Sequence, residues 1–225
     1  HGIVPDAKNR LATKFLLPRV AHNIVVADTA IRAYSELYGI RFGANTSVIY
    51  NGVDTARLSP EGGDLRAELG IGPEVPLIGM IGNFYPERRK DQLTVCRALP
   101  EVLEQFPDAR CVFVGGVEPG AEAKFDECRK FCDDGGIGEN VYFLGRRSDV
   151  PDILSALDIF VFSSCQEGLP IALNEAMLAG VPTIVSDIPS LIEASGAGEY
   201  SLVFPVGDEA ALAQSVISLL KDPVR

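Results

Sequence analysis

The stretch VYFLGRRSDVPDILSALDIFVFSSCQEGLPIALNEAMLAGVPTIVSD, residues 141–187, decides the fold of this chain. It contains short apolar runs at residues 159–163 and 183–186, which are rich in β-branched and aromatic side chains and are typical of strands. Helical patterns at residues 150–156 and 171–179 lie between such runs. Strands that alternate with helices pair in parallel through right-handed crossovers. The stretch therefore predicts an α/β protein with a doubly wound, Rossmann-like parallel sheet.

The same alternation extends outward from this stretch. Further strands are expected at residues 77–81, 110–114, 141–144 and 202–204, and further helices at residues 91–106, 119–132 and 209–220. In sheets of this kind, ligands bind at the carboxyl ends of the strands, where loops lead into helix N-termini. The loops that follow the strands are therefore the places to look for a site.

The first part of the chain has a different pattern. A helix is expected at residues 8–22, a strand at 24–27, a second helix at 29–38 and a short strand at 48–50. The turn Asn51-Gly52 and the Pro/Gly-rich residues 59–63 are typical of a linker. We place a boundary near Asn45, which divides the chain into domains of residues 1–45 and 46–225. We expect the strand at 24–27 to lack sheet partners.

Composition excludes several classes of function. The chain has 31 acidic and 20 basic residues, a formal net charge of −11, which disfavours binding to nucleic acid or to an anionic membrane surface. Five cysteines form no paired framework and no CxxC motif, so we expect reduced thiols and no metal site. The odd cysteine count and the lack of a secretory segment favour the cytoplasm. No apolar run approaches the roughly 20 residues of a transmembrane span.

The loop at residues 163–170, SSCQEGLP, joins an expected strand to an expected helix. Gly168 permits a tight turn, and Pro170 suits the first turn of a helix, where its missing N–H costs nothing. The helix start would then direct free N–H groups at an anion or a sugar hydroxyl. Glu175 lies eight residues after Glu167, and the two carboxylates can accept hydrogen bonds from two sets of hydroxyls. Alternatively, Glu167 stabilises only the helix start and Glu175 is a solvated surface charge.

Residues 141–187 resemble the donor-binding region of family 4 retaining glycosyltransferases, which have the GT-B fold. In that family a strand ends in Phe-Leu-Gly, a Ser-x-x-Glu-Gly loop follows, and two glutamates form an E-x7-E signature. The resemblance implies that Glu167 contacts the donor sugar and Glu175 the ribose hydroxyls. It also implies that the backbone of Gly168 and Leu169, at the helix start formed with Pro170, meets the sugar or phosphate.

A second element, IGMIGNFYPERRKDQ at residues 78–92, resembles the family's Gly-Arg-Leu segment followed by a lysine at a helix start. In the family, that arginine and lysine hold the donor diphosphate and neutralise the leaving group. Lys90 matches the lysine, whereas Asn83, after Gly82, stands where the arginine is expected. Arg88 or Arg89 would then supply the guanidinium. The alternative is that these charges belong to a solvated loop before a helix.

The resemblance continues at both ends of these segments. Contacts to the nucleobase are expected near Gly145 and Arg146. The segment SVIYNGVDTARLSP, residues 47–60, resembles the family's interdomain segment, which begins Val-Ile-Pro-Asn-Gly. Residues 20–40 resemble the last strand and helix of the acceptor domain, and His1 falls where many members carry an acceptor-side histidine. The chain therefore resembles one half of a GT-B fold, with a remnant of the acceptor domain and most of that domain missing.

The resemblance implies a hexosyltransferase that moves a sugar from a UDP-, GDP- or ADP-linked donor to a sugar, lipid or other hydroxyl acceptor, with retention of configuration. The sequence contains no DxD-type acidic cluster, so we expect neither metal nor cofactor. Two alternatives stay open: a sugar-nucleotide-binding module without turnover, and a GT-B nucleotide-sugar epimerase. A nicotinamide-dependent dehydrogenase is disfavoured because no strand is followed by G-x-G-x-x-G. Without its acceptor half, we expect the chain to bind donor weakly and to transfer little sugar.

Overall fold

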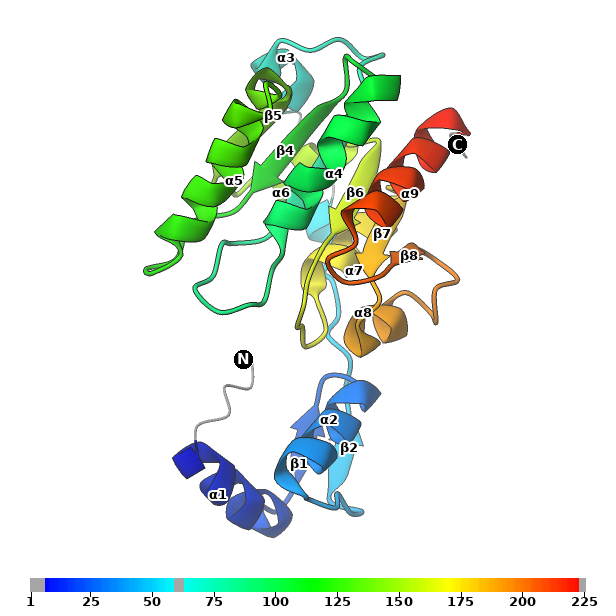
Figure 1. Ribbon diagram of the computed structural model, residues 1–225. Helices are drawn as coiled ribbons and strands as arrows, with labels where there is room; N and C mark the ends of the chain where they lie inside the picture. Colours follow the sequence, from blue (N-terminus) through cyan, green and yellow to red (C-terminus); the bar gives the residue numbers. More distant parts are fainter. Residues whose placement is uncertain (1–6, 59–62, 223–225) are drawn as a thin grey trace.

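The computed structural model describes residues 7–58 and 63–222. Its main feature is a six-stranded sheet in the order β5-β4-β3-β6-β7-β8, in which every neighbouring pair is parallel (Figure 1). The strands are β3 (Leu77–Ile81), β4 (Arg110–Val114), β5 (Val141–Gly145), β6 (Ile159–Phe162), β7 (Thr183–Ser186) and β8 (Leu202–Phe204). The predicted doubly wound parallel sheet is confirmed.

The strand order reverses between β3 and β6, the two central strands. From β3 the chain proceeds outward to β4 and β5, and from β6 it proceeds to β7 and β8 on the other side. The helices that follow β3 and β6 therefore pack on opposite faces of the sheet, and in doubly wound sheets ligands bind at the carboxyl ends of the strands at such a reversal. This switch point is the position in the fold at which a ligand is expected.

Helices cover both faces of the sheet. Helices α4 (Gln92–Gln105), α5 (Glu122–Asp134) and α9 (Glu209–Lys221) share one apolar core with inward-facing strand residues. Helices α3 (Leu65–Leu69), α6 (Val150–Ala156), α7 (Ile171–Leu178) and α8 (Pro189–Ala194) contribute to a second core on the other face. Strand side chains alternate between the two cores, because successive residues of a strand point to opposite faces. In β4, Val112 belongs to the second core and Phe113 to the first.

Residues 7–58 form a smaller unit beyond the main sheet (Figure 1). It contains α1 (Ala7–Leu16), the 3-10 turn η1 (Leu17–Arg19), β1 (Asn23–Val25), α2 (Asp28–Tyr38), β2 (Thr46–Val48) and η2 (Thr55–Leu58). Strands β1 and β2 pair in parallel, with Ile24 opposite Ser47. The expectation that this first strand lacks a partner was therefore wrong. The first helix is also shorter than expected, because Pro18 cannot continue an α-helix.

The element boundaries follow the sequence pattern closely within the main sheet. Four strands have the predicted limits: β3, β4, β7 and β8. Helix α5 begins at Glu122, three residues later than expected, because Gly120 has φ +87° and breaks the helical conformation. Short helices α3 and α8 and the 3-10 turn η3 (Gly138–Asn140) were not predicted. Among the described residues, no helix is long and apolar enough to cross a membrane.

Candidate functional site

Backbone hydrogen bonds join the loops that follow the two central strands. The Asp91 N–H donates to the Ser163 carbonyl at 3.0 Å, and the Cys165 N–H donates to the Arg89 carbonyl at 2.7 Å. Lys90 and Ser164 form an isolated antiparallel bridge between these contacts. The loop that carries Lys90 is therefore fixed directly beside the loop that carries Glu167.

Lys90 and Glu167 form a buried ion pair at this junction. Lys90 Nζ lies 2.7 Å from Glu167 Oε1, and the two side chains are 9% and 8% exposed. Ser164 Oγ donates to the same carboxylate oxygen at 2.9 Å, and Lys90 Nζ lies 3.5 Å from the centroid of the Phe162 ring. Burial lowers the pKa of the Lys90 ammonium, while the ion pair with Glu167 opposes this shift. The pair thus holds a desolvated positive charge at the switch point.

The path of the Lys90 side chain explains the glycine that follows β3. A Cβ atom at Gly82 would lie 2.8 Å from Lys90 Cε, which is closer than real contacts permit. Any other residue at this position would displace the lysine. Gly82 therefore serves the site by leaving room for Lys90.

Helix α7 begins directly after the loop that carries Glu167. Pro170 is its N-cap residue, and Gly168 and Leu169 precede it with backbone N–H groups that make no hydrogen bond to any described residue. The Leu169 carbonyl accepts a hydrogen bond from Asn51 Nδ2 at 2.9 Å, which anchors the loop to the segment that follows β2. The free N–H groups and the helix dipole make this end of α7 attractive to an anion.

Glu175 has different surroundings from Glu167. Its side chain is part-buried on α7, and burial raises the pKa of its carboxyl above the ordinary value. Within residues 7–58 and 63–222, the Glu175 carboxylate has neither a hydrogen-bond donor nor a cation as partner. Both acceptor oxygens are therefore available to a ligand.

A polar network lies at the carboxyl ends of the other half of the sheet. Oε1 of Glu118 accepts from Asn83 Nδ2 at 2.7 Å and from an Nη2 N–H of Arg146 at 2.5 Å. The Asn83 amide oxygen accepts from the Gly116 N–H at 2.8 Å, so both ends of the Asn83 amide are occupied. Sequence reasoning missed Glu118 and Gly116, although both follow the predicted strand β4. Gly145, which ends β5 at φ +66°, directs the chain into Arg146.

Arg88 and His1 complete the set of predicted site residues. Arg88 lies close enough to Cys165 to influence the pKa of that thiol, which burial raises and Arg88 opposes. His1 lies outside the described residues. No group of three His, Cys, Asp or Glu side chains within the described ranges is arranged to hold a metal ion. Metal-free chemistry and the roles of the individual site residues stay predictions.

Another carboxylate, that of Glu193, connects the main sheet unit to residues 7–58. Glu193 on α8 accepts from the Asp28 N–H at 2.6 Å, from the Thr29 N–H at 2.8 Å and from Tyr50 Oη at 2.8 Å. Burial alone would raise the pKa of the Glu193 carboxyl, but these hydrogen bonds lower it overall. The same contact raises the pKa of Tyr50 to about 12. Glu193 thereby supplies the side-chain cap that the N-terminus of α2 lacks within its own segment.

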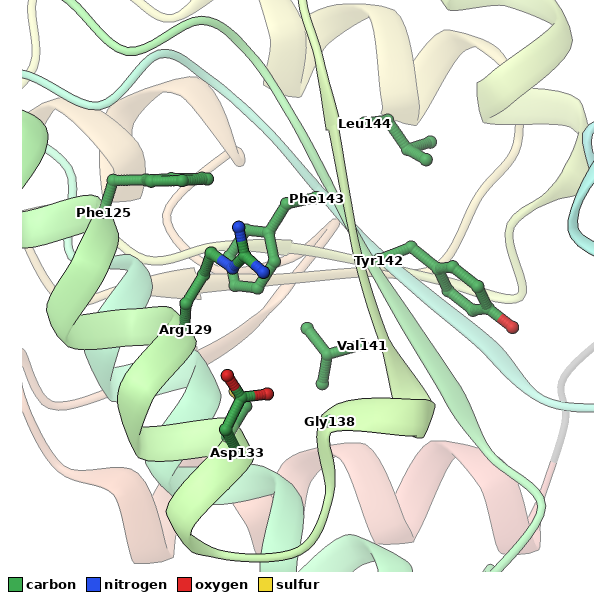
Figure 2. Close-up of a pocket in the computed structure, with 9 residues that line it drawn as sticks. Phe125, Arg129, Asp133, Gly138, Val141, Tyr142, Phe143 and Leu144 are labelled. Carbon is green, nitrogen blue, oxygen red and sulfur yellow. The ribbon is translucent and has the colours of Figure 1, made fainter.

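Figure 2 shows a separate cavity of about 330 Å³ between α5 and the edge strand β5. Phe125, Arg129 and Asp133 line it from α5, and Phe143 lines it from β5. None of the predicted site residues that the structure describes lines this cavity. A second cavity of about 810 Å³ contacts the outer side of α7 through Asn174, Met177 and Leu178.

Comparison with solved structures identifies the class of protein. The chain superposes on sucrose-phosphate synthase from Thermosynechococcus elongatus with a TM-score of 0.80 and 26% identity, over 97% of this chain and 53% of that one. It also superposes on Anabaena HepE, solved in complex with UDP and glucose, with a TM-score of 0.87 and 24% identity, over 97% of this chain and 59% of that one. Together with the doubly wound sheet, these likenesses define one half of a GT-B glycosyltransferase fold.

The family follows from sequence comparison. Residues 75–222 match the family described as "Glycosyl transferases group 1", and the chain belongs to that family. It is 35% identical over 147 residues to the UDP-Gal:alpha-D-GlcNAc-diphosphoundecaprenol alpha-1,3-galactosyltransferase of Escherichia coli, covering 63% of this chain and 36% of the relative. It is 30% identical over 209 residues to the phosphatidyl-myo-inositol mannosyltransferase of Mycobacterium leprae, covering 92% and 51%. The chain thus spans about half or less of these relatives.

Proposed function

We propose that this chain supplies the donor site of a retaining glycosyltransferase that uses a nucleoside diphosphate sugar. The observation that carries the proposal is the buried Lys90–Glu167 pair at the switch point, next to the free N–H groups at the start of α7. A desolvated ammonium and a helix N-terminus both favour a phosphate group. The family membership and the names of the relatives, which are sugar transferases, support the same function.

The roles of the two glutamates follow from their surroundings. Glu175 has free acceptor oxygens, and we assign it to the ribose hydroxyls, which are common to donor and product. Glu167 is fixed by Lys90 and Ser164, and we assign its second oxygen, Oε2, to a hydroxyl of the transferred sugar. Phosphate binding at Lys90 would weaken the ion pair between Lys90 and Glu167. A substitution of either residue would therefore change how the other contributes to donor binding.

Negative charge develops on the diphosphate as the glycosidic bond breaks. Lys90 and the N–H groups of Gly168 and Leu169 would stabilise this charge in a site shielded from water. We propose that the acceptor hydroxyl attacks from the same face as the leaving diphosphate, whose oxygen takes the hydroxyl proton. This course retains the configuration and requires neither a protein nucleophile nor a metal. The acceptor is a sugar, lipid or other hydroxyl compound.

Two measurements test this proposal. Calorimetric titration with UDP, GDP and ADP should reveal binding of at least one of them, and Lys90→Met should weaken that binding about tenfold or more. The anomeric configuration of the product, followed by NMR during transfer by the protein with its acceptor half, should match that of the donor. Binding without transfer would instead favour a sugar-nucleotide-binding module. Inversion would refute the retaining course.

A further inference from the structure

Four of the five cysteines lie together in the apolar core on one face of the sheet. They are Cys96 on α4, Cys111 on β4, and Cys128 and Cys132 on α5, and each is at most 2% exposed. The fifth, Cys165, lies in the loop after β6 and is partly exposed. All five thiols are free. The core therefore brings together thiols that are distant in sequence.

Three of these thiols are close neighbours. The Cys96 thiol lies within hydrogen-bonding reach of the thiols of Cys128 and Cys132. Cys128 and Cys132 are four residues apart, so they share one face of α5. The described residues contain no group of His, Cys, Asp or Glu side chains arranged to hold a metal ion, so these thiols are not placed as metal ligands. Their proximity favours disulfide formation instead, because a disulfide requires two neighbouring sulfur atoms.

Cys132 differs from its two neighbours because it lines the cavity between α5 and β5 that Figure 2 shows. This cavity has a volume of about 330 Å³, whereas one water molecule occupies about 30 Å³ in the liquid. It therefore has room for a small molecule such as hydrogen peroxide beside the Cys132 side chain. Arg129 lines the same cavity, and its positive charge favours a thiolate nearby.

The contacts among the thiols indicate which one loses its proton most readily. Hydrogen bonding to Cys128 and Cys132, together with burial, raises the pKa of the Cys96 thiol. The hydrogen bond with Cys96 lowers the pKa of the Cys132 thiol, while burial and the charge of Asp133 oppose this shift. The thiolate is the nucleophilic form of cysteine. Cys132 is thus the nucleophile of the cluster, and Cys96 is the thiol that donates to it.

We propose that Cys132 and Cys96 form a redox-active pair, in which Cys132 reacts with hydrogen peroxide in the cavity and Cys96 completes a disulfide. The Cys132 thiolate attacks one peroxide oxygen and the O–O bond breaks, which gives a sulfenic acid and hydroxide. The hydroxide takes up the proton that Cys132 released. The Cys96 sulfur then attacks the sulfenic sulfur, the S–O bond breaks, and water leaves with the Cys96 proton. Overall, two thiols are oxidised to one disulfide and one peroxide is reduced to two water molecules.

The experiment identifies the disulfide by its peptides. Trypsin separates the three neighbouring thiols, with Cys96 on residues 91–97, Cys128 on residues 125–129 and Cys132 on residues 131–146. Reduced protein would be treated with hydrogen peroxide, blocked with iodoacetamide and digested without reductant for mass spectrometry. We expect a cross-link between peptides 91–97 and 131–146 that dithiothreitol reverses. Cys132 should also be oxidised at least about tenfold faster than Cys111, which does not line the cavity.

Substitutions test the order of the two steps. In Cys96→Ala, the sulfenic acid at Cys132 should persist and be captured by dimedone, whereas Cys132→Ala should form no cross-link through peptide 91–97. Cys165→Ala, which removes the partly exposed thiol outside the cluster, is the matched control and should leave the cross-link unchanged.

Thermal unfolding would verify that each variant is folded, and the cross-link in wild-type protein tests the pair without any substitution. A cross-link between peptides 91–97 and 125–129 would overturn the assignment to Cys132. The absence of any cross-link, or oxidation of Cys132 no faster than that of Cys111, would overturn the inference as a whole. Neither result bears on the proposed function, because none of these thiols belongs to the donor site.

Discussion

The loop after β6 and the helix α7 that follows it each carry one glutamate of the E-x7-E pair, and the two carboxylates have opposite surroundings. Glu167 is 8% exposed and bonded to Lys90 and Ser164, whereas Glu175 is part-buried with no bonding partner among the described residues. Unpaired carboxylates at partly buried sites cost stability. Under the proposed function, Glu167 would contribute to both structure and site, whereas Glu175 would bind a ligand at a cost in stability.

The largest expected effect is on stability, and it comes from breaking the buried ion pair between Lys90 and Glu167. Glu167→Ala leaves the Lys90 ammonium buried without its counter-ion, and should lower the free energy of unfolding by about 3 kcal/mol. Urea denaturation at neutral pH measures this loss. The double variant Lys90→Met with Glu167→Leu is the control, because it removes both charges and should recover most of the stability. A loss below about 1 kcal/mol for Glu167→Ala would show that the pair is not a structural element.

The second effect concerns nucleotide binding by Glu175, the glutamate without a bonding partner among the described residues. Glu175→Ala should weaken nucleoside diphosphate binding by about 1.5–3 kcal/mol, because hydrogen bonds from the ribose to a charged acceptor are lost. Its unfolding free energy should stay the same or rise, since a part-buried unpaired charge is removed. Calorimetry measures the nucleotide affinity of this variant, and urea denaturation measures its free energy of unfolding. If Glu167→Ala weakened nucleotide binding more than Glu175→Ala does, the assigned roles would have to be exchanged.

Glu193 provides a further test of this comparison. Like Glu167, it is a carboxylate whose hydrogen-bond partners belong to the protein itself. Glu193→Ala removes the cap from α2 and should cost about 1 kcal/mol of stability without changing nucleotide affinity. The folded-state pKa of Glu193 is lowered, so its contribution is present above the ordinary glutamate pKa and is lost as pH falls through the lowered value. The difference in stability between wild type and variant, measured from pH 7 downward, should shrink only in acid. A constant difference would contradict the role of the carboxylate.

The smallest expected effect is the pH dependence of binding. The pKa of Glu175 is raised, so its carboxyl takes up a proton at a higher pH than an ordinary glutamate. A protonated carboxyl accepts fewer hydrogen bonds, and nucleotide affinity should therefore fall as pH is lowered toward and through that value. Glu175→Gln, which is uncharged at every pH, should bind more weakly at neutral pH and lose this dependence. If nucleotide affinity fell equally with pH in wild type and in Glu175→Gln, the pH dependence would belong to another group.

The sequence predicted the sheet well because its strands are local patterns. Apolar runs such as residues 77–81 and 183–186 specify buried parallel strands without reference to any other part of the chain. The site was predicted less completely, because its contacts join residues that are distant in sequence. Glu118 lies 35 positions from Asn83, and no local pattern indicates that the two side chains are bonded. The direct pairing of Lys90 with Glu167 was missed for the same reason, since each was considered only as a ligand for the donor.

The short elements were missed for a different physical reason. Helices α3 and α8 have five and six residues, too few to show a helical period, and they are stabilised by packing against the sheet. The pairing of β1 with β2 was missed because a three-residue strand has no recognisable partner in the sequence. In each case the deciding interaction lies outside the segment itself.

The most direct test of the central claim is the position of a bound nucleoside diphosphate. Backbone chemical shifts recorded during titration, or a crystal structure of the complex, would show where it binds. We predict contacts with Lys90, with the Gly145–Arg146 turn and with the segment from Glu167 to Glu175, at the carboxyl ends of β3, β5 and β6. Binding confined to the cavity between α5 and β5 in Figure 2, or to the outer side of α7, would contradict the account.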